Sequence, residues 1–245
     1  MNTHILPVVP RHSEVDINGK VKLRAVFDYI QEAAAQHAEL LGCGMRFLAK
    51  EKKIWVLSRM RLHFNRPLLL GEKLTVFTYP RGFDKLFALR PLVIKDERGS
   101  EIMQALSLWL LLDMERGRIL RPAENLSCPL PDNSELPGYF DTPDKPAVPA
   151  EEMPVIFTST TRDAQIDLNR HMNNAEYALY THSAIAELTK TAPYFEDLTV
   201  NFSKATKSGE KLFWRAKVND DRSFVVIASD ESGAERFQAA GTLAL

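Results

Sequence analysis

Residues 14–23 read EVDINGKVKL, and residues 165–174 read QIDLNRHMNN. Both contain Asp-x-Asn shortly before a stretch with helical spacing of apolar residues, but only the second has a histidine, His171, two residues after the asparagine. Lys20 occupies the corresponding position of the first stretch. The repeated frame predicts two copies of one structural unit. The single histidine predicts that only the second copy carries chemistry.

Two further blocks recur in the same order along the chain. The sequence GEKL occurs at 71–74 and again at 209–212, and DERGSEIMQA at 96–105 matches DESGAERFQA at 230–239. The offsets between the copies are 151, 138 and 134 residues. Loop deletions in the second copy explain this drift, so we interpret the chain as an internal duplication.

A proline-rich segment separates the two copies. Residues 122–154 hold eight of the chain's 14 prolines, and proline resists both helix and sheet. We therefore expect an N-terminal unit at 1–121, a linker at 122–153 and a C-terminal unit at 154–245.

Each copy has the pattern of a short strand, one helix and several longer strands. Apolar residues at helical spacing predict helices at 23–41 and 175–188. Runs rich in β-branched and aromatic residues predict the longer strands. These are 54–64, 73–79, 86–94, 105–112, 198–202, 212–218, 223–229 and 236–245. The expected fold class is α+β, with each helix on a sheet of about five antiparallel strands.

Composition excludes several classes of protein. With 45% hydrophobic residues the chain can bury a core, and its formal net charge of -1 gives no general attraction to nucleic acid or anionic lipid. The longest apolar run, 108–112, is far shorter than the roughly 20 residues of a membrane span, and the first ten residues lack a signal pattern. Cys43 and Cys128 match no metal or redox spacing, and one possible pair is no disulfide framework. We expect a cytoplasmic protein in reducing surroundings.

Three stretches of the chain resemble the acyl-acyl carrier protein thioesterases of bacterial type. They are residues 54–80, residues 105–122, and the D-x-N-x-H-x-N-N motif that starts at Asp167 and is followed by Tyr177. The resemblance implies a tandem (double) hot-dog fold with two helices on one continuous antiparallel sheet. It also implies hydrolysis of fatty acyl-acyl carrier protein thioesters, which releases free fatty acid and ends chain elongation, with no metal or organic cofactor. The C-terminal unit would be catalytic, and the N-terminal unit would shape the acyl pocket.

Thioester hydrolysis requires an attacking oxygen, a group that moves its proton, and donors for the charge on the carbonyl oxygen. His171 is the candidate base or proton shuttle, because imidazole exchanges protons near neutral pH. Asp167 can orient His171, activate water or attack the carbonyl itself. Asn169 can donate to the oxyanion or to the imidazole. Both Asp167 and Asn169 can equally shape a turn, and their retention in the copy without a histidine favours that alternative.

The neighbourhood of this motif holds two further features. Asn173 and Asn174 are expected to cap the following helix rather than to react. Plant members of the family carry a Glu-Cys pair after the strand that corresponds to 198–204, and this chain has Ala205 and Thr206 there. Neither residue can replace a carboxylate as an acid or base.

Other functions stay open at this point. An acyl-coenzyme A thioesterase would use the same chemistry, and an acyl-binding module without turnover would fit the absent glutamate. The expected partner is an acyl carrier protein with a phosphopantetheine-linked fatty acyl chain, and no nucleic acid or membrane. Because a tandem chain already contains two units, a monomer is consistent with the sequence. A homodimer is also consistent with it, since exposed sheet faces or edges could pair.

Overall fold

The computed structural model describes residues 2–149 and 151–244, so residues 1, 150 and 245 of the expected units and linker lie outside it. Its contacts divide the chain into two compact units. The first unit comprises Met1–Val9, Tyr29–Asn65 and Gly71–Pro143, and the second comprises Pro10–Asp28, Arg66–Leu70 and Asp144–Leu245. The boundaries expected from the duplicated sequence stay a prediction.

The first unit contains an antiparallel sheet. Its strand order is β1 (His4–Val8), β3 (Leu74–Thr78), β5 (Phe87–Lys95), β6 (Glu101–Asp113) and β2 (Lys53–Phe64), with β4 (Phe83–Asp84) paired to β5 and β7 (Arg118–Leu120) paired to β6. Its helical segments are the part of α1 (Leu23–Leu40) from Tyr29 onward, α2 (Met45–Lys50) and α3 (Pro122–Asn125). Buried and partly exposed residues alternate along β3, as expected for a strand with one face on the core.

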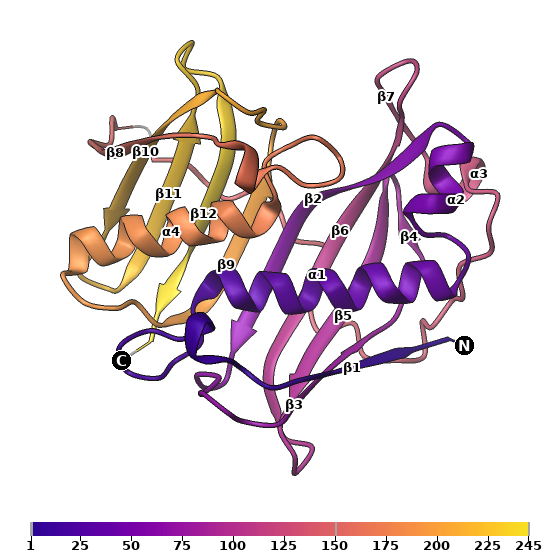
Figure 1. Cartoon of the computed structure of the whole chain (residues 1–245), viewed down its shortest axis with the longest axis horizontal. Helices are drawn as coiled ribbons and strands as arrows, with labels where there is room; N and C mark the ends of the chain where they lie inside the picture. The colour runs from indigo at the N-terminus through magenta and orange to yellow at the C-terminus, as the bar shows by residue number, and fades with distance from the viewer. Residues whose placement is uncertain (1, 150, 245) are drawn as a thin grey trace. The chain divides into compact units, whose positions relative to one another are not determined.

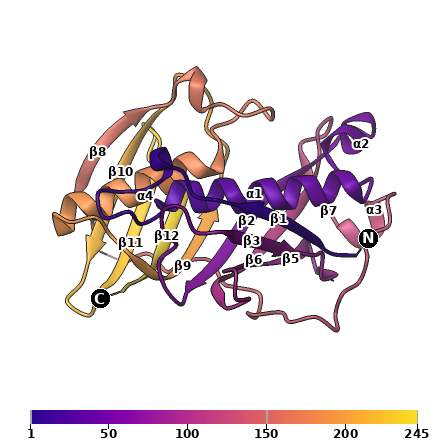
Figure 2. The ribbon, with the colours of Figure 1, turned by 60° about the horizontal axis from the view of Figure 1, so that its bottom comes forward.

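The second unit contains a run of five neighbouring antiparallel strands. Its antiparallel strands follow the order β9 (Phe195–Phe202), β12 (Glu235–Leu243), β11 (Ser223–Ser229), β10 (Lys211–Val218) and β8 (Val155–Thr160). Figures 1 and 2 show α4 (Asn174–Thr189) running across the strands of this sheet. Short 3-10 helices precede each repeated turn, at His12–Glu14 (η1) and Asp163–Gln165 (η2).

Aromatic packing holds α4 on its sheet. The ring of Tyr177 lies 5.1 Å from that of Phe237, and the ring of Tyr180 lies 4.8 Å from that of Trp214. Trp214 and Phe237 are fully buried. Offset and tilted rings at these separations add to the free energy gained from burying their area. The N-terminal half of the helix is therefore fixed against β10 and β12.

One glycine permits a close approach of backbone in this sheet. A Cβ at Gly241 of β12 would lie 1.9 Å from the carbonyl oxygen of Asp197 on β9. No side chain fits in that space, so the pairing of these two strands requires glycine.

The predicted elements agree well with the structure. Both predicted helices are present, at Leu23–Leu40 and Asn174–Thr189, and every predicted strand is present with its ends shifted by a few residues. Helices α2 and α3 and strands β4 and β7 were not predicted. No helix in the described ranges is long and apolar enough to cross a membrane.

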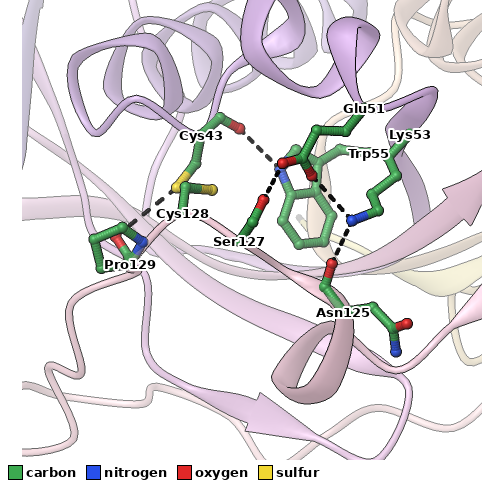
Figure 3. Close-up of a disulfide and its surroundings, with 8 residues drawn as sticks. All are labelled: Cys43, Glu51, Lys53, Trp55, Asn125, Ser127, Cys128 and Pro129. Carbon is green, nitrogen blue, oxygen red and sulfur yellow. Dashed lines mark hydrogen bonds and ion pairs between the residues drawn. A yellow bond between two sulfur atoms is a disulfide. The ribbon is translucent and has the colours of Figure 1, made fainter.

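The two cysteines form a disulfide in the first unit, which departs from the expectation of reducing surroundings. The Cα atoms of Cys43 and Cys128 are 5.6 Å apart, and neither cysteine is free. Figure 3 shows the polar contacts beside it: the Trp55 indole donates to the Cys43 carbonyl at 3.2 Å, and Lys53 Nζ donates to the Asn125 carbonyl at 2.6 Å. The start of the linker is thus fastened to the residues around α2 and β2.

Candidate active site

Asp167, Asn169 and His171 lie together in one tight turn before α4. The backbone amide of Asp167 donates to the carbonyl of His171, and the amide of Arg170 donates to the carbonyl of Asp167, each at 2.9 Å. The Asp167 carboxylate accepts from the Asn169 amide at 2.8 Å. The three candidate residues thus lie in one turn, and all three are partly exposed. Their catalytic roles stay a prediction.

The first copy forms the same turn. The amide of Asp16 donates to the carbonyl of Lys20 at 2.8 Å, and the Asp16 carboxylate accepts from the Asn18 amide at 2.8 Å. The Lys20 ammonium, at the position of the histidine, lies 5.1 Å from the centre of the Tyr194 ring. The Asp-x-Asn frame therefore builds the turn in both copies, whether or not a histidine follows.

One backbone conformation differs in its cost between the two turns. Arg170 has a φ of 62°, and Gly19 at the matched position has a φ of 73°. Glycine adopts this left-handed region freely, whereas a residue with a Cβ does so at a cost in free energy. The turn with the histidine therefore contains local backbone strain that the other turn lacks.

Helix α4 begins directly after the second turn. The Asn173 side chain accepts from the Ala175 amide at 2.8 Å, and α4 starts at Asn174. The prediction of a cap is confirmed for Asn173. Because the first amides of a helix carry partial positive charge, this end of α4 favours negative charge near the turn.

The Asp167 and His171 side chains are both partly exposed. Within residues 2–149 and 151–244, no hydrogen bond or ion pair joins the Asp167 carboxylate to the His171 imidazole. One carboxylate oxygen of Asp167 is instead engaged by the turn itself. In the same ranges no group of three or more His, Cys, Asp or Glu side chains is placed to hold a metal ion.

Comparisons with known proteins identify the family of the chain. Residues 9–129 match the family model of the acyl-ACP thioesterase N-terminal domain, and residues 152–241 match that of the acyl-ACP thioesterase C-terminal domain. The chain belongs to the acyl-ACP thioesterase family.

Two plant members of the family illustrate the distance in sequence. The oleoyl-acyl carrier protein thioesterase 2 of Arabidopsis thaliana is 23% identical over 185 residues, which cover 69% of this chain and 50% of that protein. The palmitoyl-acyl carrier protein thioesterase of Cuphea hookeriana is 22% identical over 183 residues, covering 68% of this chain and 43% of that protein. The chain thus spans about half the length of the relatives it matches.

Solved structures of the family share the fold along the whole chain. An acyl-ACP thioesterase from Bacteroides thetaiotaomicron superposes with a TM-score of 0.83 at 20% identity, covering 99% of this chain and 98% of that one. The 12:0-ACP thioesterase from Umbellularia californica gives 0.79 at 17% identity, covering 99% and 97%. The expected fold class, an α+β double hot-dog, is confirmed.

Segment 205–206, where the resemblance to plant members implies a Glu-Cys pair, lies directly against the turn. The amide of Met172, next to His171, donates to the Thr206 carbonyl at 2.8 Å. The hydroxyls of Tyr177 and Thr206 are 2.8 Å apart, and burial raises the pKa of Tyr177 to about 12. Ala205 is exposed and Thr206 is fully buried. The sequence analysis singled out Ala205 and Thr206 but did not predict that Thr206 contacts the turn.

A buried arginine, Arg236 of β12, reaches the same segment from the other side. Its guanidinium donates to Asp230 at 2.8 and 3.0 Å, lies 3.2 Å from Glu210, and donates to the Ala205 carbonyl. Hydrogen bonds from the Ser232 hydroxyl and from Arg236 hold the pKa of Asp230 well below its usual range. Arg236 was not identified from the sequence, because a charged residue near the start of a strand that also contains Glu235, Gln238 and Thr242 gives no signal of burial.

The first turn of α4 also contains a buried acid, Glu176. It pairs with Arg24 at 2.8 Å and accepts from the Gln165 side chain at 3.0 Å. Both carboxylate oxygens are engaged, so Glu176 is a structural ion-pair partner in this arrangement rather than a free base.

Proposed function

We propose that the chain hydrolyses fatty acyl-acyl carrier protein thioesters and releases free fatty acid, which terminates chain elongation. The observation that carries this proposal is the comparison of the two turns: one backbone frame occurs twice, and only the copy at the start of α4 holds a histidine. The family membership supplies the substrate class. The two relatives described above are named for oleoyl and palmitoyl acyl carrier protein substrates.

In the proposed reaction His171 acts as a general base. The imidazole takes a proton from water, and the water oxygen attacks the thioester carbonyl to give a tetrahedral intermediate. The intermediate then collapses with cleavage of the carbon–sulfur bond, and the imidazolium returns the proton to the departing thiolate. The products are a fatty acid and the carrier's free phosphopantetheine thiol.

Charge on the carbonyl oxygen is stabilised by donors of the same turn. The side-chain amide of Asn169 lies on the turn, and the positive end of α4 follows directly after it. Donors that are fixed in place before the reaction are most effective for a developing oxyanion. One carboxylate oxygen of Asp167 accepts from the backbone amide of Asn169. This contact favours a role for Asp167 in holding the turn that carries His171 over attack on the carbonyl.

The division of labour between the halves is part of the proposal. Residues 154–245 carry the reaction, and residues 1–121 shape the site for the acyl chain. The partner is an acyl carrier protein. Carrier proteins of this class are acidic, so a local group of basic residues would serve docking.

The direct test is release of free fatty acid from purified acyl-acyl carrier proteins of several chain lengths. Each acyl group is also presented on coenzyme A, and His171→Ala is compared with the intact protein. We expect faster release from the carrier protein and loss of release in His171→Ala. Faster release from coenzyme A would replace the proposal with an acyl-coenzyme A thioesterase, and binding without release would replace it with an acyl-binding module.

Cytoplasmic location is also proposed, and the Cys43–Cys128 pair provides its test. A reducing cytoplasm keeps a thiol pair of this kind reduced. Cells are lysed in denaturant with an alkylating reagent, and the mass of the protein is measured. Alkylation of both cysteines is expected, whereas an intact disulfide would contradict the cytoplasmic location.

A further inference from the structure

The segment after β9 in the second copy and the segment after β2 in the first support their turns through the same backbone bond. In the second copy the Met172 amide donates to the Thr206 carbonyl at 2.8 Å, and in the first the Val21 amide donates to the Leu68 carbonyl at 2.9 Å. The GEKL blocks place Leu68 and Thr206 at matched positions. This backbone bond is therefore a property of the fold and requires no particular side chain.

The side chains around this bond differ in kind between the copies. Alignment of the three repeated blocks matches Val26, Leu68 and Ile102 of the first copy with Tyr177, Thr206 and Arg236 of the second. The first three are apolar and buried, at 2%, 2% and 1% exposure. Their counterparts are polar and equally buried, at 3%, 0% and 6%. The first copy shows that the turn folds without these polar groups.

Burying polar groups at these positions has a cost that folding alone does not explain. A buried hydroxyl or guanidinium loses its water and regains stability only through well-placed partners. Each of the three side chains has such a partner. The hydroxyls of Tyr177 and Thr206 are hydrogen-bonded at 2.8 Å, and the Arg236 guanidinium pairs with Asp230 and Glu210. The polar groups occur only in the copy that holds His171.

Arg236 completes the contact at Ala205. The Ser203 amide donates to the Arg236 carbonyl at 2.9 Å, as the Asn65 amide does to the Ile102 carbonyl at 2.8 Å in the first copy. Arg236 adds a side-chain bond, from its guanidinium to the Ala205 carbonyl, which the apolar Ile102 cannot make. In the first copy the matched carbonyl, that of Pro67, accepts instead from the neighbouring Arg66 at 2.9 Å. The backbone at residue 205 is thus held by a guanidinium that comes from a different strand.

We propose that Tyr177, Thr206 and Arg236 form a polar support, a set of positioning residues that holds segment 205–206 against Met172 and thereby fixes the backbone that carries His171. This inference rests on the proposed thioesterase function. Because the three side chains are buried, they act through the turn and do not touch the substrate. Reacting groups must be held within a fraction of an ångström, so a small gain in mobility at the turn lowers the rate.

Kinetic variants test the polar support with a matched control in the other copy. Thr206→Val and Tyr177→Phe remove one hydroxyl each with little change in shape, and Thr206→Ser keeps the hydroxyl. Leu68→Val is a small apolar change at the matched position of the first copy. We expect kcat to fall on the order of 10-fold in the first two variants with KM unchanged. Thr206→Ser and Leu68→Val should retain kcat. Equal losses in Thr206→Ser and Thr206→Val, or no loss in either hydroxyl deletion, would overturn the proposal.

Amide hydrogen exchange separates this inference from the proposed function. In Thr206→Val we expect the Met172 amide to exchange on the order of 2- to 10-fold faster than in the intact protein, as weakening of one hydrogen bond predicts. The Val21 amide, in the same molecule, should be unchanged. If the intact protein releases no fatty acid, the proposed function is wrong, but the exchange rate of the Met172 amide still shows whether the polar support holds the turn. Unchanged exchange at Met172 refutes the support even if the protein is an active thioesterase.

Discussion

The turn at Asp16 and the turn at Asp167 have the same backbone hydrogen bonds but different surroundings. Each is closed by an amide-to-carbonyl bond across its ends, at 2.8 and 2.9 Å, and each aspartate accepts from the amide of the following asparagine at 2.8 Å. Only the second turn contains a histidine, His171, and a non-glycine residue at positive φ, Arg170. Only the second turn is packed against the polar side chain of Thr206. Asp-x-Asn therefore forms the turn in both copies, and only one copy gained or kept the histidine that the proposed function requires.

The largest expected difference between the turns is in activity. His171→Ala should lower turnover of acyl-acyl carrier protein on the order of 100- to 10,000-fold, because it removes the proton-transfer group. Lys20→Ala, the matched change in the first turn, should leave turnover unchanged. The measurement is initial-rate release of free fatty acid at saturating substrate. A comparable loss from both changes would mean that the two turns do not differ in function.

The disulfide gives the next largest expected difference, because it fastens only the first unit. Cys43 and Cys128 are 85 residues apart in sequence, and a loop of that size corresponds to about 4.5 kcal/mol of unfolding free energy in the chain-entropy account. We expect the Cys43→Ser, Cys128→Ser double variant to unfold at lower denaturant concentration than the oxidised protein. Reduced protein should match the variant. Equal midpoints for oxidised and reduced protein would contradict the bond's contribution.

Substitution of the two aspartates distinguishes their contribution to unfolding free energy from their contribution to turnover. Asp16→Ala and Asp167→Ala each remove the carboxylate that accepts an amide of the turn, and each should cost about 1 kcal/mol of unfolding free energy. Asp167→Ala should also lower turnover, whereas Asp16→Ala should not. Chemical denaturation and fatty acid release, measured on both variants, check this. If Asp16→Ala lowers turnover as much, the aspartate's role in both copies is structural alone.

The smallest expected effect concerns the positive φ. Arg170→Gly should raise the unfolding free energy by up to about 1 kcal/mol, because glycine adopts this conformation without a clash. Gly19→Arg should lower it by a similar amount. Thermal unfolding of both variants provides the measurement. A loss of stability in Arg170→Gly would show that the arginine's own contacts outweigh the backbone strain.

Local patterns predicted most of the fold because the sequence repeats itself. Helical spacing identified both long helices, and alternating or apolar runs identified the longer strands. The pattern did not predict α2, which has six residues, because so short a helix has no apolar period to recognise. The disulfide also escaped prediction: two cysteines 85 residues apart carry no spacing signal, and only their approach in space pairs them.

The candidate site was predicted in part for the same reason. Asp167, Asn169 and His171 lie within five consecutive residues, so their proximity follows from the chain itself. Thr206 and Arg236 are 35 and 65 residues away from His171, and no periodicity links them to it. The contact of Thr206 with the turn and that of Arg236 with Ala205 depend on strand pairing and on which face of β12 is buried.

By itself, the sequence determined that this protein is a duplicated α+β chain with one histidine-bearing turn, because repeats, periodicity and turn motifs are local properties that survive in the linear order of residues. Only the tertiary structure decided which side chains support that turn. A hydrogen bond between distant residues requires both partners to be placed within about 3 Å, and that placement comes from the packing of helix α4 and the register of its sheet. The same polar residues elsewhere on this sheet would carry no such role.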